Sequence, residues 1–403
     1  MISRLALEAE LSRTTTQVEP LNYRIGENSS VRILIDYRPA LRHRTGVGLW
    51  IHNLVEALAA CSRSCDLAIT VFSSSWKDRL SVALPTGVTG IERRVPVRLL
   101  NWLWHHKEWP KVESLTSSYF DVVHSPSPLL IPTRRAARLI TIHDIDFLAH
   151  PHHGSREIRS DYPSLARLHA HRADGVIVPS AYTGDQVART LQIPRDRITV
   201  CPNGAPSWSA RARPPENGHI MFVGTIAPRK NIDRLLTAYA ALREQSEGIP
   251  PLLLVGQATP EAASTLARLS SAPLAGHVHV LGYVDDTELL TLYRRAILVV
   301  LPSLDEGFGV PALEAMSLGV PLVAARRGAL PEVVGNAGFL VDPMDTEAIT
   351  AALQSVLTDI SLRNRLIAAG LARAPLFSWR NSATSLIQAY LQAIERTKTT
   401  KPH

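Results

Sequence analysis

Two glutamates, Glu306 and Glu314, stand eight residues apart in the segment Glu306-Gly-Phe-Gly-Val-Pro-Ala-Leu-Glu314. Carboxylates accept hydrogen bonds, so their natural partners are hydroxyl groups, such as those of a sugar ring or a ribose. The turn is rich in glycine and opens a helix near Pro311, and the unpaired N–H groups of a helix start suit a phosphate or a sugar oxygen. The alternative is that both acids merely complement the helix dipole.

Two adjacent cations, Arg229 and Lys230, follow a predicted strand that ends at Gly224. Arginine can grip a phosphate through two parallel hydrogen bonds, and lysine supplies a compact point charge. The pair could therefore neutralise a diphosphate in place of a metal ion, and no metal site is predicted. Such a pair on a loop is often only solvated, but the Glu pair at the same sheet edge favours the functional interpretation.

Three further residues sit where predicted strands end. Gly46 and Gly48 follow the first strand and would let the backbone approach a ligand closely, although a simple tight turn explains them equally well. His143 follows the run Ile-Thr-Ile and could donate a hydrogen bond to a sugar hydroxyl or to developing charge. A lone histidine at such a place is also often structural.

Other chemistries lack their motifs. The chain has no Gly-x-Gly-x-x-Gly with a following acid, which disfavours a nicotinamide dehydrogenase. It has no Walker loop, no Gly-x-Ser-x-Gly and no His-x-x-x-His with a supporting carboxylate, which disfavours hydrolysis by those routes. No basic run with interleaved aromatics and no recognisable motif indicates nucleic-acid binding.

Short apolar runs alternate with helical patterns, which predicts right-handed βαβ units and parallel sheets. The predicted strands are 31–35, 68–72, 122–124, 139–142, 175–179, 219–224, 252–256, 278–281, 297–301, 322–324 and 338–341. The predicted helices include 48–60, 231–244 and a long final helix near 382–396. The expected fold class is α/β, with two doubly wound, Rossmann-like domains facing each other across a deep cleft.

The stretch 205–218 has three prolines and no apolar periodicity, which is typical of a linker. It divides the chain into five predicted parts. These are a poorly ordered extension over 1–30, an acceptor-side domain over 31–204, the linker 205–218, a donor-binding domain over 219–380, and a C-terminal helix over 381–403 that packs back on the first domain.

Charge and composition limit the surroundings. The net charge is +7, and residues 31–215 hold 24 Lys and Arg against 15 Asp and Glu. This excess favours an anionic partner for the first half, such as a membrane surface, although a solvated basic face is the alternative. No run reaches the roughly 18 apolar residues of a spanning helix, no signal peptide is visible, and three cysteines fit a reducing cytoplasm.

The motifs together resemble glycosyltransferase family 4, whose members retain anomeric configuration and have the GT-B fold. The resemblance rests on the Glu-x7-Glu segment, on Phe-Val-Gly-Thr with Arg229-Lys230-Asn, and on Val-Cys-Pro-Asn-Gly204, Leu-Gly-Tyr-Val284 and Leu-Pro-Ser303. Arg-Thr-Gly-Val-Gly48 and Ile-His143-Asp resemble the first-domain half of the pattern. In particular, the chain resembles the bacterial branch of the family that includes mannosyltransferases of lipopolysaccharide and exopolysaccharide assembly.

The resemblance implies a role for each motif residue. Arg229 and Lys230 would hold the donor diphosphate beside Gly224, and Glu314 would bind the ribose hydroxyls. The donor sugar would contact Glu306, His143 and the backbone of Phe308, Gly309 and Val310. Tyr283 and Val284 would lie against the base, while Gly46 and Gly48 would approach the phosphate. The leaving phosphate would act as base, with neither a metal nor a protein nucleophile.

The expected function is transfer of a hexose, with mannose favoured, from a GDP- or UDP-sugar to a hydroxyl of a glycan or lipid-linked glycan in cell-surface polysaccharide assembly. The expected location is the cytoplasm, with peripheral contact at the inner face of the cell membrane left open. A nucleotide-sugar epimerase of the same architecture is the nearest rival enzyme. A non-catalytic module that binds nucleotide sugars is the rival from another class.

Overall fold

The computed structural model describes residues 30–41, 46–62, 65–76, 78–80, 84–149 and 161–400. The predicted extension over 1–30, apart from Ser30, lies outside the described residues, as do Arg44 and Thr45 of the first glycine loop. The chain divides into two compact units. The first unit contains the residues up to Cys201 and those from Ser382 onward, and the second unit is Pro202–Asn381.

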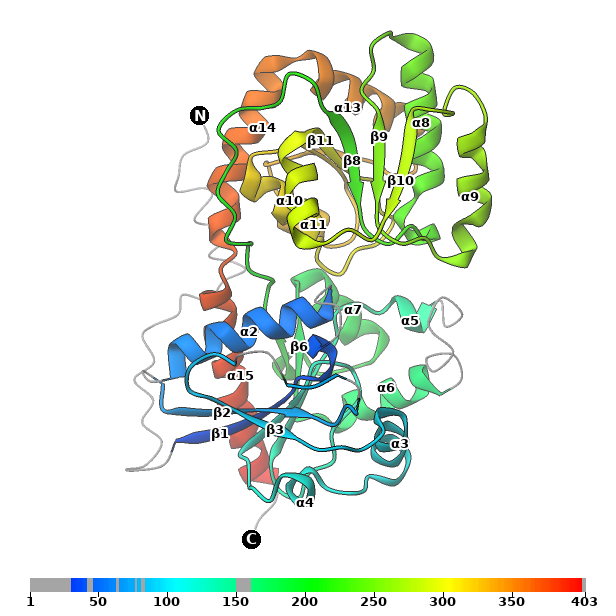
Figure 1. The fold of residues 1–403 in the computed structure, drawn as a ribbon. Coiled ribbons are helices and arrows are strands. Elements are labelled where there is room, and N and C mark those ends of the chain that lie inside the picture. Colours follow the sequence, from blue (N-terminus) through cyan, green and yellow to red (C-terminus); the bar gives the residue numbers. More distant parts are fainter. Residues whose placement is uncertain are drawn as a thin grey trace. The chain divides into compact units, whose positions relative to one another are not determined.

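The first unit is built on a parallel sheet whose strands follow the order β3-β2-β1-β4-β5-β6-β7 in the described part of the chain. The strands are β1 (Val31–Asp36), β2 (Leu67–Ser73), β3 (Val88–Glu92), β4 (Val122–Ser125), β5 (Ala137–Thr141), β6 (Gly175–Val178) and β7 (Ile198–Val200). The helices are α2 (Val47–Ser62), α3 (Val97–Trp102), α4 (Val112–Thr116), α5 (Asp146–Ala149), α6 (Tyr162–Arg172) and α7 (Ala181–Thr190), with short turns η1 (Arg38–Leu41), η2 (Leu103–Lys107) and η4 (Arg195–Arg197). Figure 1 shows these helices flanking the sheet.

The final helix α15 (Trp379–Thr400) is fastened to the first unit through most of its length. The Tyr390 hydroxyl lies 2.8 Å from Nδ1 of His124, a fully buried residue of β4. Arg396 donates a hydrogen bond to the carbonyl of Asp174, just before β6. The apolar face of this helix is therefore buried on the first unit.

The second unit is a parallel sheet with the strand order β10-β9-β8-β11-β12-β13. Its strands are β8 (His219–Val223), β9 (Leu252–Val255), β10 (Val278–Gly282), β11 (Ala296–Leu301), β12 (Leu322–Ala325) and β13 (Phe339–Val341). Its helices are α8 (Ile232–Gln245), α9 (Ala263–Ala267), α10 (Asp286–Arg295), α11 (Val310–Leu318), α12 (Leu330–Val334), α13 (Thr346–Thr358) and α14 (Ile360–Arg373), with short turns η5 (Pro228–Lys230), η6 (Pro260–Ala262), η7 (Arg268–Ser270) and η8 (Ala374–Leu376).

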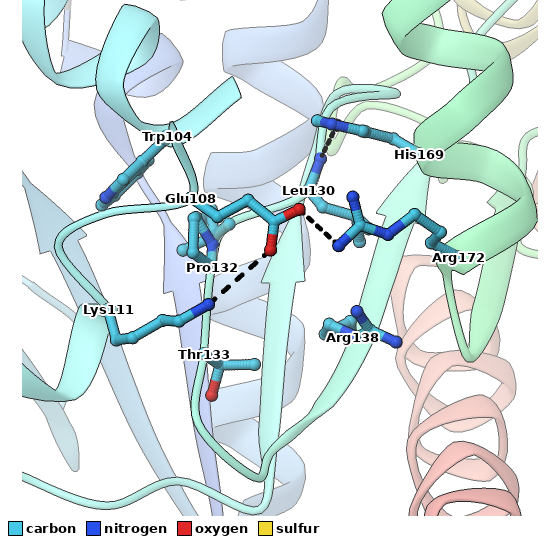
Figure 2. Close-up of a pocket in the computed structure, with 10 residues that line it drawn as sticks. Trp104, Glu108, Lys111, Leu130, Pro132, Thr133, Arg138, His169 and Arg172 are labelled. Carbon is cyan, nitrogen blue, oxygen red and sulfur yellow. Dashed lines mark hydrogen bonds and ion pairs between the residues drawn. The ribbon is translucent and has the colours of Figure 1, made fainter. Parts of the chain in front are cut away.

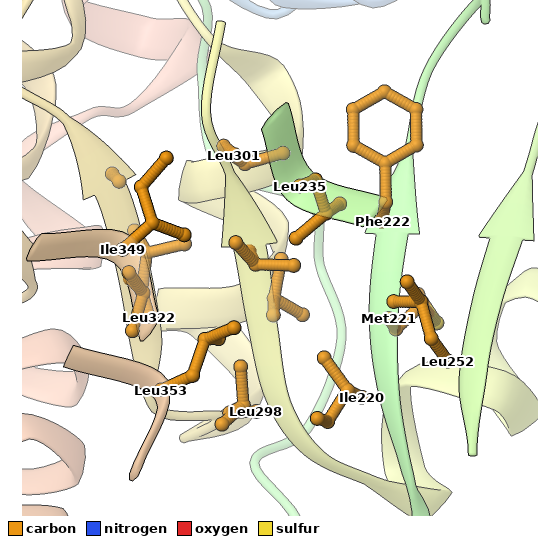
Figure 3. Packing of buried hydrophobic residues seen from close by; sticks show 14 of the residues in the cluster. Ile220, Met221, Phe222, Leu235, Leu252, Leu298, Leu301, Leu322, Ile349 and Leu353 are labelled. Atoms are coloured by element: carbon orange, nitrogen blue, oxygen red, sulfur yellow. The ribbon is translucent and has the colours of Figure 1, made fainter. Parts of the chain in front are cut away.

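The core of the second unit explains why its strands read as continuous apolar runs. Ile220, Met221 and Phe222 of β8 are fully buried and belong to the same cluster as Leu298 of β11 and Leu353 of α13. Figure 3 shows these side chains around the sheet. Strands of a parallel sheet covered by helices on both faces have no polar side, so the apolar runs extend through each strand.

Every strand predicted from the sequence is present, with bounds that differ by at most two residues. The prediction missed β3 and β7. β3 is a partly exposed edge strand that contains Gly90, and β7 has three half-buried residues at the opposite edge. Neither gives the buried β-branched run by which the other strands were identified.

The segment 205–218 contains no helix or strand and is held against the second unit. The Trp208 ring lies 5.8 Å from the ring of Tyr293, and Arg211 donates hydrogen bonds to the carbonyls of Ala296 and Gly319. These contacts fix the path by which the chain enters β8. Among the described residues, no helix is both long enough and apolar enough to cross a membrane.

Candidate active site

The strand order of the second unit reverses between β8 and β11. The chain moves outward from β8 to β9 and β10 on one side, and from β11 to β12 and β13 on the other. Doubly wound sheets bind ligands at the carboxyl ends of the strands where this reversal occurs. The loops 224–231 and 302–309 leave the sheet at this switch point.

Backbone groups tie these two loops together. The Leu304 N–H donates to the carbonyl of Arg229 over 2.8 Å, and Nη1 of Arg229 donates to the carbonyl of Asp305 over 3.2 Å. Asn231, which has a left-handed backbone, donates from its side-chain amide to the carbonyls of Pro302 and Pro343. The cations on one loop are consequently held in register with the acidic turn on the other.

Lys230 and Glu306 form a buried ion pair at this junction. Their exposed fractions are 7% and 8%, and Nζ of Lys230 donates to Oε1 of Glu306. The Ser303 hydroxyl donates to the same oxygen over 2.7 Å, and Nη1 of Arg229 lies 3.6 Å from Oε2. Two cations and one carboxylate leave one net positive charge, which favours an anion.

Opposing effects act on the pKa of Glu306. Burial alone would raise it, but the charges of Lys230 and Arg229 and the hydrogen bonds from Lys230 and Ser303 hold it below its usual value. Glu306 is therefore ionised at neutral pH. The cations thus have two tasks: they stabilise a buried carboxylate and they supply the positive charge of the site.

Close backbone packing leaves little room around these loops. Gly224 lies beside the Lys230 side chain, where a Cβ would be 3.7 Å from the Lys230 Cε. A Cβ on Gly256 would be 2.1 Å from the Gly224 carbonyl oxygen, which excludes a side chain there. Gly309 has a φ of +97° where it caps α11, a conformation that a side chain would strain.

Glu314 lies in the second turn of α11, and the first turn contains no acid. The dipole of α11, which acts on its first turn, therefore does not account for Glu314. The Tyr293 hydroxyl of α10 lies 2.7 Å from Oε2 of Glu314. Burial raises the pKa of Glu314 to about 7, although the hydrogen bond from Tyr293 lowers it in part.

The other predicted residues of the second unit are divided between core and surface. The Phe308 side chain packs in the core, with its ring 5.8 Å from that of Phe377, so its backbone alone faces the turn. Val310 begins α11. Tyr283 is half exposed just beyond β10, and Val284 packs partly against the core. Since β9 separates β10 from β8, these two residues lie two strands from the Lys230 loop.

The residues predicted in the first domain lie in the first unit. Gly46, with a φ of +53°, precedes α2, and Gly48 is buried in its first turn. His143 follows β5 and packs edge-on against Trp50, with 5.0 Å between ring centres. Its Nε2 and the Nε1 of Trp50 are buried and have no hydrogen-bond partner among the residues that the structure describes. Burial lowers the pKa of His143 to about 4. His143 is therefore neutral at physiological pH.

The structure thus brings Arg229, Lys230 and Glu306 into one cluster, which the sequence predicted only as residues at a common sheet edge. Tyr293, which holds Glu314, was not predicted, and Ser303, which holds Glu306, was noted only within the motif Leu-Pro-Ser303 and given no role. Ser303 lies three residues before Glu306 and could have been found as a local partner. Tyr293 belongs to a different helix, and nothing in its spacing signals the contact.

Comparison with known proteins agrees with this architecture. The family profile described as "Glycosyltransferase Family 4" matches residues 44–207, and the one described as "Glycosyl transferases group 1" matches residues 209–373. The chain is 35% identical over 285 residues to the O-antigen chain mannosyltransferase B of Escherichia coli, which covers 68% of this chain and 74% of that protein. It is 31% identical over 289 residues to a glycogen synthase of Mycobacterium tuberculosis, and the match covers 68% of this chain and 69% of that protein.

A solved structure, the sucrose-phosphate synthase from Thermosynechococcus elongatus, shares the fold with a TM-score of 0.70 at 21% identity, covering 91% of this chain and 99% of that chain. The fold and the matches define the class of protein: a glycosyltransferase with the GT-B fold. The chain belongs to glycosyltransferase family 4.

Proposed function

We propose that the chain is a retaining hexosyltransferase of the cytoplasm. It moves mannose from a GDP- or UDP-sugar to a hydroxyl of a glycan or lipid-linked glycan during assembly of a cell-surface polysaccharide. The contact of Lys230 and Arg229 with Glu306 at the switch point carries the proposal. The 35% identity to an O-antigen mannosyltransferase favours mannose.

In the proposed reaction, the acceptor hydroxyl attacks the anomeric carbon while the bond from that carbon to the diphosphate breaks. The acceptor proton passes to the departing phosphate oxygen, so the leaving group acts as base. Negative charge grows on the diphosphate as the bond breaks, and Arg229 and Lys230 stabilise that charge. The ammonium of Lys230 has three N–H donors, so it can bind a phosphate oxygen while it remains bonded to Glu306.

The other assignments follow from position. The N–H groups at the start of α11, near Gly309 and Val310, would donate hydrogen bonds to an oxygen of the nucleotide sugar. Glu314 would accept hydrogen bonds from the ribose, and Tyr283 with Val284 would lie against the base. We also propose that His143 contacts the donor sugar and that Gly46 and Gly48 approach the phosphate. No metal ion is required in this scheme, because the two cations provide the positive charge.

Incubation with candidate donors and acceptors tests the proposal. GDP-mannose or a UDP-hexose should raise the melting temperature, since a ligand bound at 100 times its Kd stabilises by about 2.7 kcal/mol. With a mannan-type acceptor, the product should keep the anomeric configuration of the donor, and EDTA should leave the rate unchanged. Conversion of the donor sugar without acceptor would indicate an epimerase, and donor binding without release of nucleoside diphosphate would indicate a binding module.

Donor binding should depend on pH through Glu314. Only the carboxylate accepts hydrogen bonds at both oxygens, and the pKa of Glu314 is about 7. Affinity for a nucleotide sugar should therefore rise about tenfold between pH 6 and pH 8. A nucleotide sugar is the better probe than a free nucleotide, because its diphosphate carries an ester at each end and does not titrate in this range.

Two variants serve as controls for this pH dependence. Glu314→Gln should flatten the profile, whereas Tyr293→Phe should shift it to higher pH, because the lost hydrogen bond normally lowers the pKa of Glu314. The raised pKa of Glu314 also makes the free energy of unfolding depend on pH. The unfolded chain loses this proton first, so the free energy of unfolding should fall between about pH 4.5 and 7. A flat binding profile in the unmodified protein would refute the role of Glu314.

A further inference from the structure

The segment formed by α3 and η2 in the first unit turns large apolar side chains toward solvent. Leu99 and Trp102 are 49% and 51% exposed, and Trp109, just beyond η2, is 63% exposed. The opposite side of the same segment is the core side, where Leu100 and Trp104 are fully buried. Core packing accounts for Leu100 and Trp104 but not for the three exposed apolar side chains. We call these three residues the tryptophan surface: Leu99, Trp102 and Trp109.

Cations are frequent in the sequence around the tryptophan surface. Residues 93–111 contain five Lys and Arg against one acid, Glu108. Arg94, Arg98 and Lys107 are exposed, and the Lys107 ammonium lies 5.9 Å from the centre of the Trp102 ring. Part of the basic excess of the first half of the chain is therefore concentrated beside its exposed tryptophans.

Ion pairs and a hydrogen bond in a neighbouring pocket hold the chain on both sides of Trp109. Figure 2 shows Glu108 between two cations: Arg172 of α6 lies 2.5 Å away and Lys111 3.7 Å away. Burial would raise the pKa of Glu108, but the hydrogen bond and charge of Arg172 hold it below its usual value, so the pair stays ionised. Trp104 also donates a hydrogen bond to the carbonyl of Pro110. These contacts anchor the chain on both sides of Trp109.

The pocket itself does not provide an anion site. Arg172 and Lys111 are paired with Glu108, and Arg138, on the pocket wall, is paired with Asp174 over 3.3 Å. An incoming phosphate would have to compete with these carboxylates. Arg94 and Lys107 are exposed and do not line the pocket, so the positive charge that faces solvent in this region belongs to the tryptophan surface rather than to the pocket.

We propose that the tryptophan surface docks on an anionic lipid bilayer. Tryptophan rings are apolar with one polar N–H group, which suits the level of the lipid headgroups. Exposed Lys and Arg next to them are attracted by the negative surface potential of anionic lipids. Apolar insertion and charge act together, as stable peripheral binding requires. The inference depends on the first unit alone and not on the donor assignments.

Flotation of the full chain with vesicles tests this inference. The protein should float with vesicles of phosphatidylcholine and phosphatidylglycerol and bind far less to phosphatidylcholine alone. The triple variant Arg94→Glu, Arg98→Glu, Lys107→Glu should lower partitioning by at least about a hundred-fold, since each cation contributes roughly fivefold. The double variant Trp102→Ala, Trp109→Ala should lower partitioning onto vesicles by about tenfold or more. It should also remove the blue shift of tryptophan fluorescence that we expect when the unmodified protein binds vesicles.

A matched pair on α14 is the control. Ile360 is 63% exposed and Arg365 is exposed, so Ile360→Ala with Arg365→Glu changes similar chemistry in the second unit and should leave partitioning unchanged. Transfer to a water-soluble acceptor should be normal in all these variants. Equal binding to both kinds of vesicle, or none, would overturn the inference. Loss of a dimer in the tryptophan variants would assign the surface to a contact between copies instead.

Discussion

Replacing Lys230 by alanine is expected to lower kcat/KM for sugar transfer by about a hundred- to a thousand-fold. Removal of one preorganised group that stabilises developing charge has this effect in other enzymes. The ammonium sits at the switch point beside Glu306, where the diphosphate would leave. Steady-state rates with the donor found by thermal stabilisation would measure the loss.

The same change should also reduce stability, because Glu306 would stay buried without its main partner. Breaking one side of a buried pair costs about 3–5 kcal/mol, and Arg229 at 3.6 Å should keep the loss near the lower end. The melting temperature should fall by roughly 6–12 °C. Lys230→Met combined with Glu306→Gln removes both charges, so it should regain most of the stability but none of the transfer. Recovery of transfer in the double variant would show that Lys230 acts only on folding.

Replacing Glu306 by alanine should cause a loss of activity of similar size for a different reason. The Lys230 ammonium and the Ser303 hydroxyl would both lose the oxygen to which they donate. A buried ammonium without a counter-charge tends to lose its proton, so the site would lose positive charge as well as its acceptor for sugar hydroxyls. Glu306→Gln keeps an acceptor for Ser303 and should fall between the alanine variant and the unmodified protein.

Glu347 provides the matched control for this experiment. It is exposed in the first turn of α13, where its charge complements the helix dipole. Glu347→Ala should leave transfer unchanged and change stability by about 1 kcal/mol or less. Full activity in purified Glu306→Ala would contradict the assigned role, whatever the control shows.

The sequence was sufficient to predict the sheets because each central strand is a buried apolar run between turn residues. It also placed Gly224, Glu306 and His143 at the carboxyl ends of strands. It could not show that Lys230 contacts Glu306, since these residues are 76 positions apart and meet only because β8 and β11 are neighbours. Strand order is decided by packing, and the apolar runs that predict strands do not encode it.

Burial explains the remaining differences. By residue type the two glutamates are alike, and both were predicted to accept hydrogen bonds from hydroxyl groups. The structure gives them opposite electrostatics: cations lower the pKa of Glu306, whereas burial raises the pKa of Glu314, whose hydroxyl partner Tyr293 is neutral. Residue type and spacing cannot separate these two cases, because the deciding contacts come from Lys230 and from Tyr293 on other elements.

The close packing of Gly256 on Gly224 limits which residues can be changed to alter the preference for the nucleotide-sugar donor. Substitutions at Gly256 should mostly prevent correct folding, because even a methyl group there would lie 2.1 Å from the carbonyl oxygen of Gly224. Tyr283 is half exposed and Val284 packs only partly against the core, so substitutions there should cost less stability. Under the proposed contact of these two residues with the base, a search for a new donor preference would begin with them.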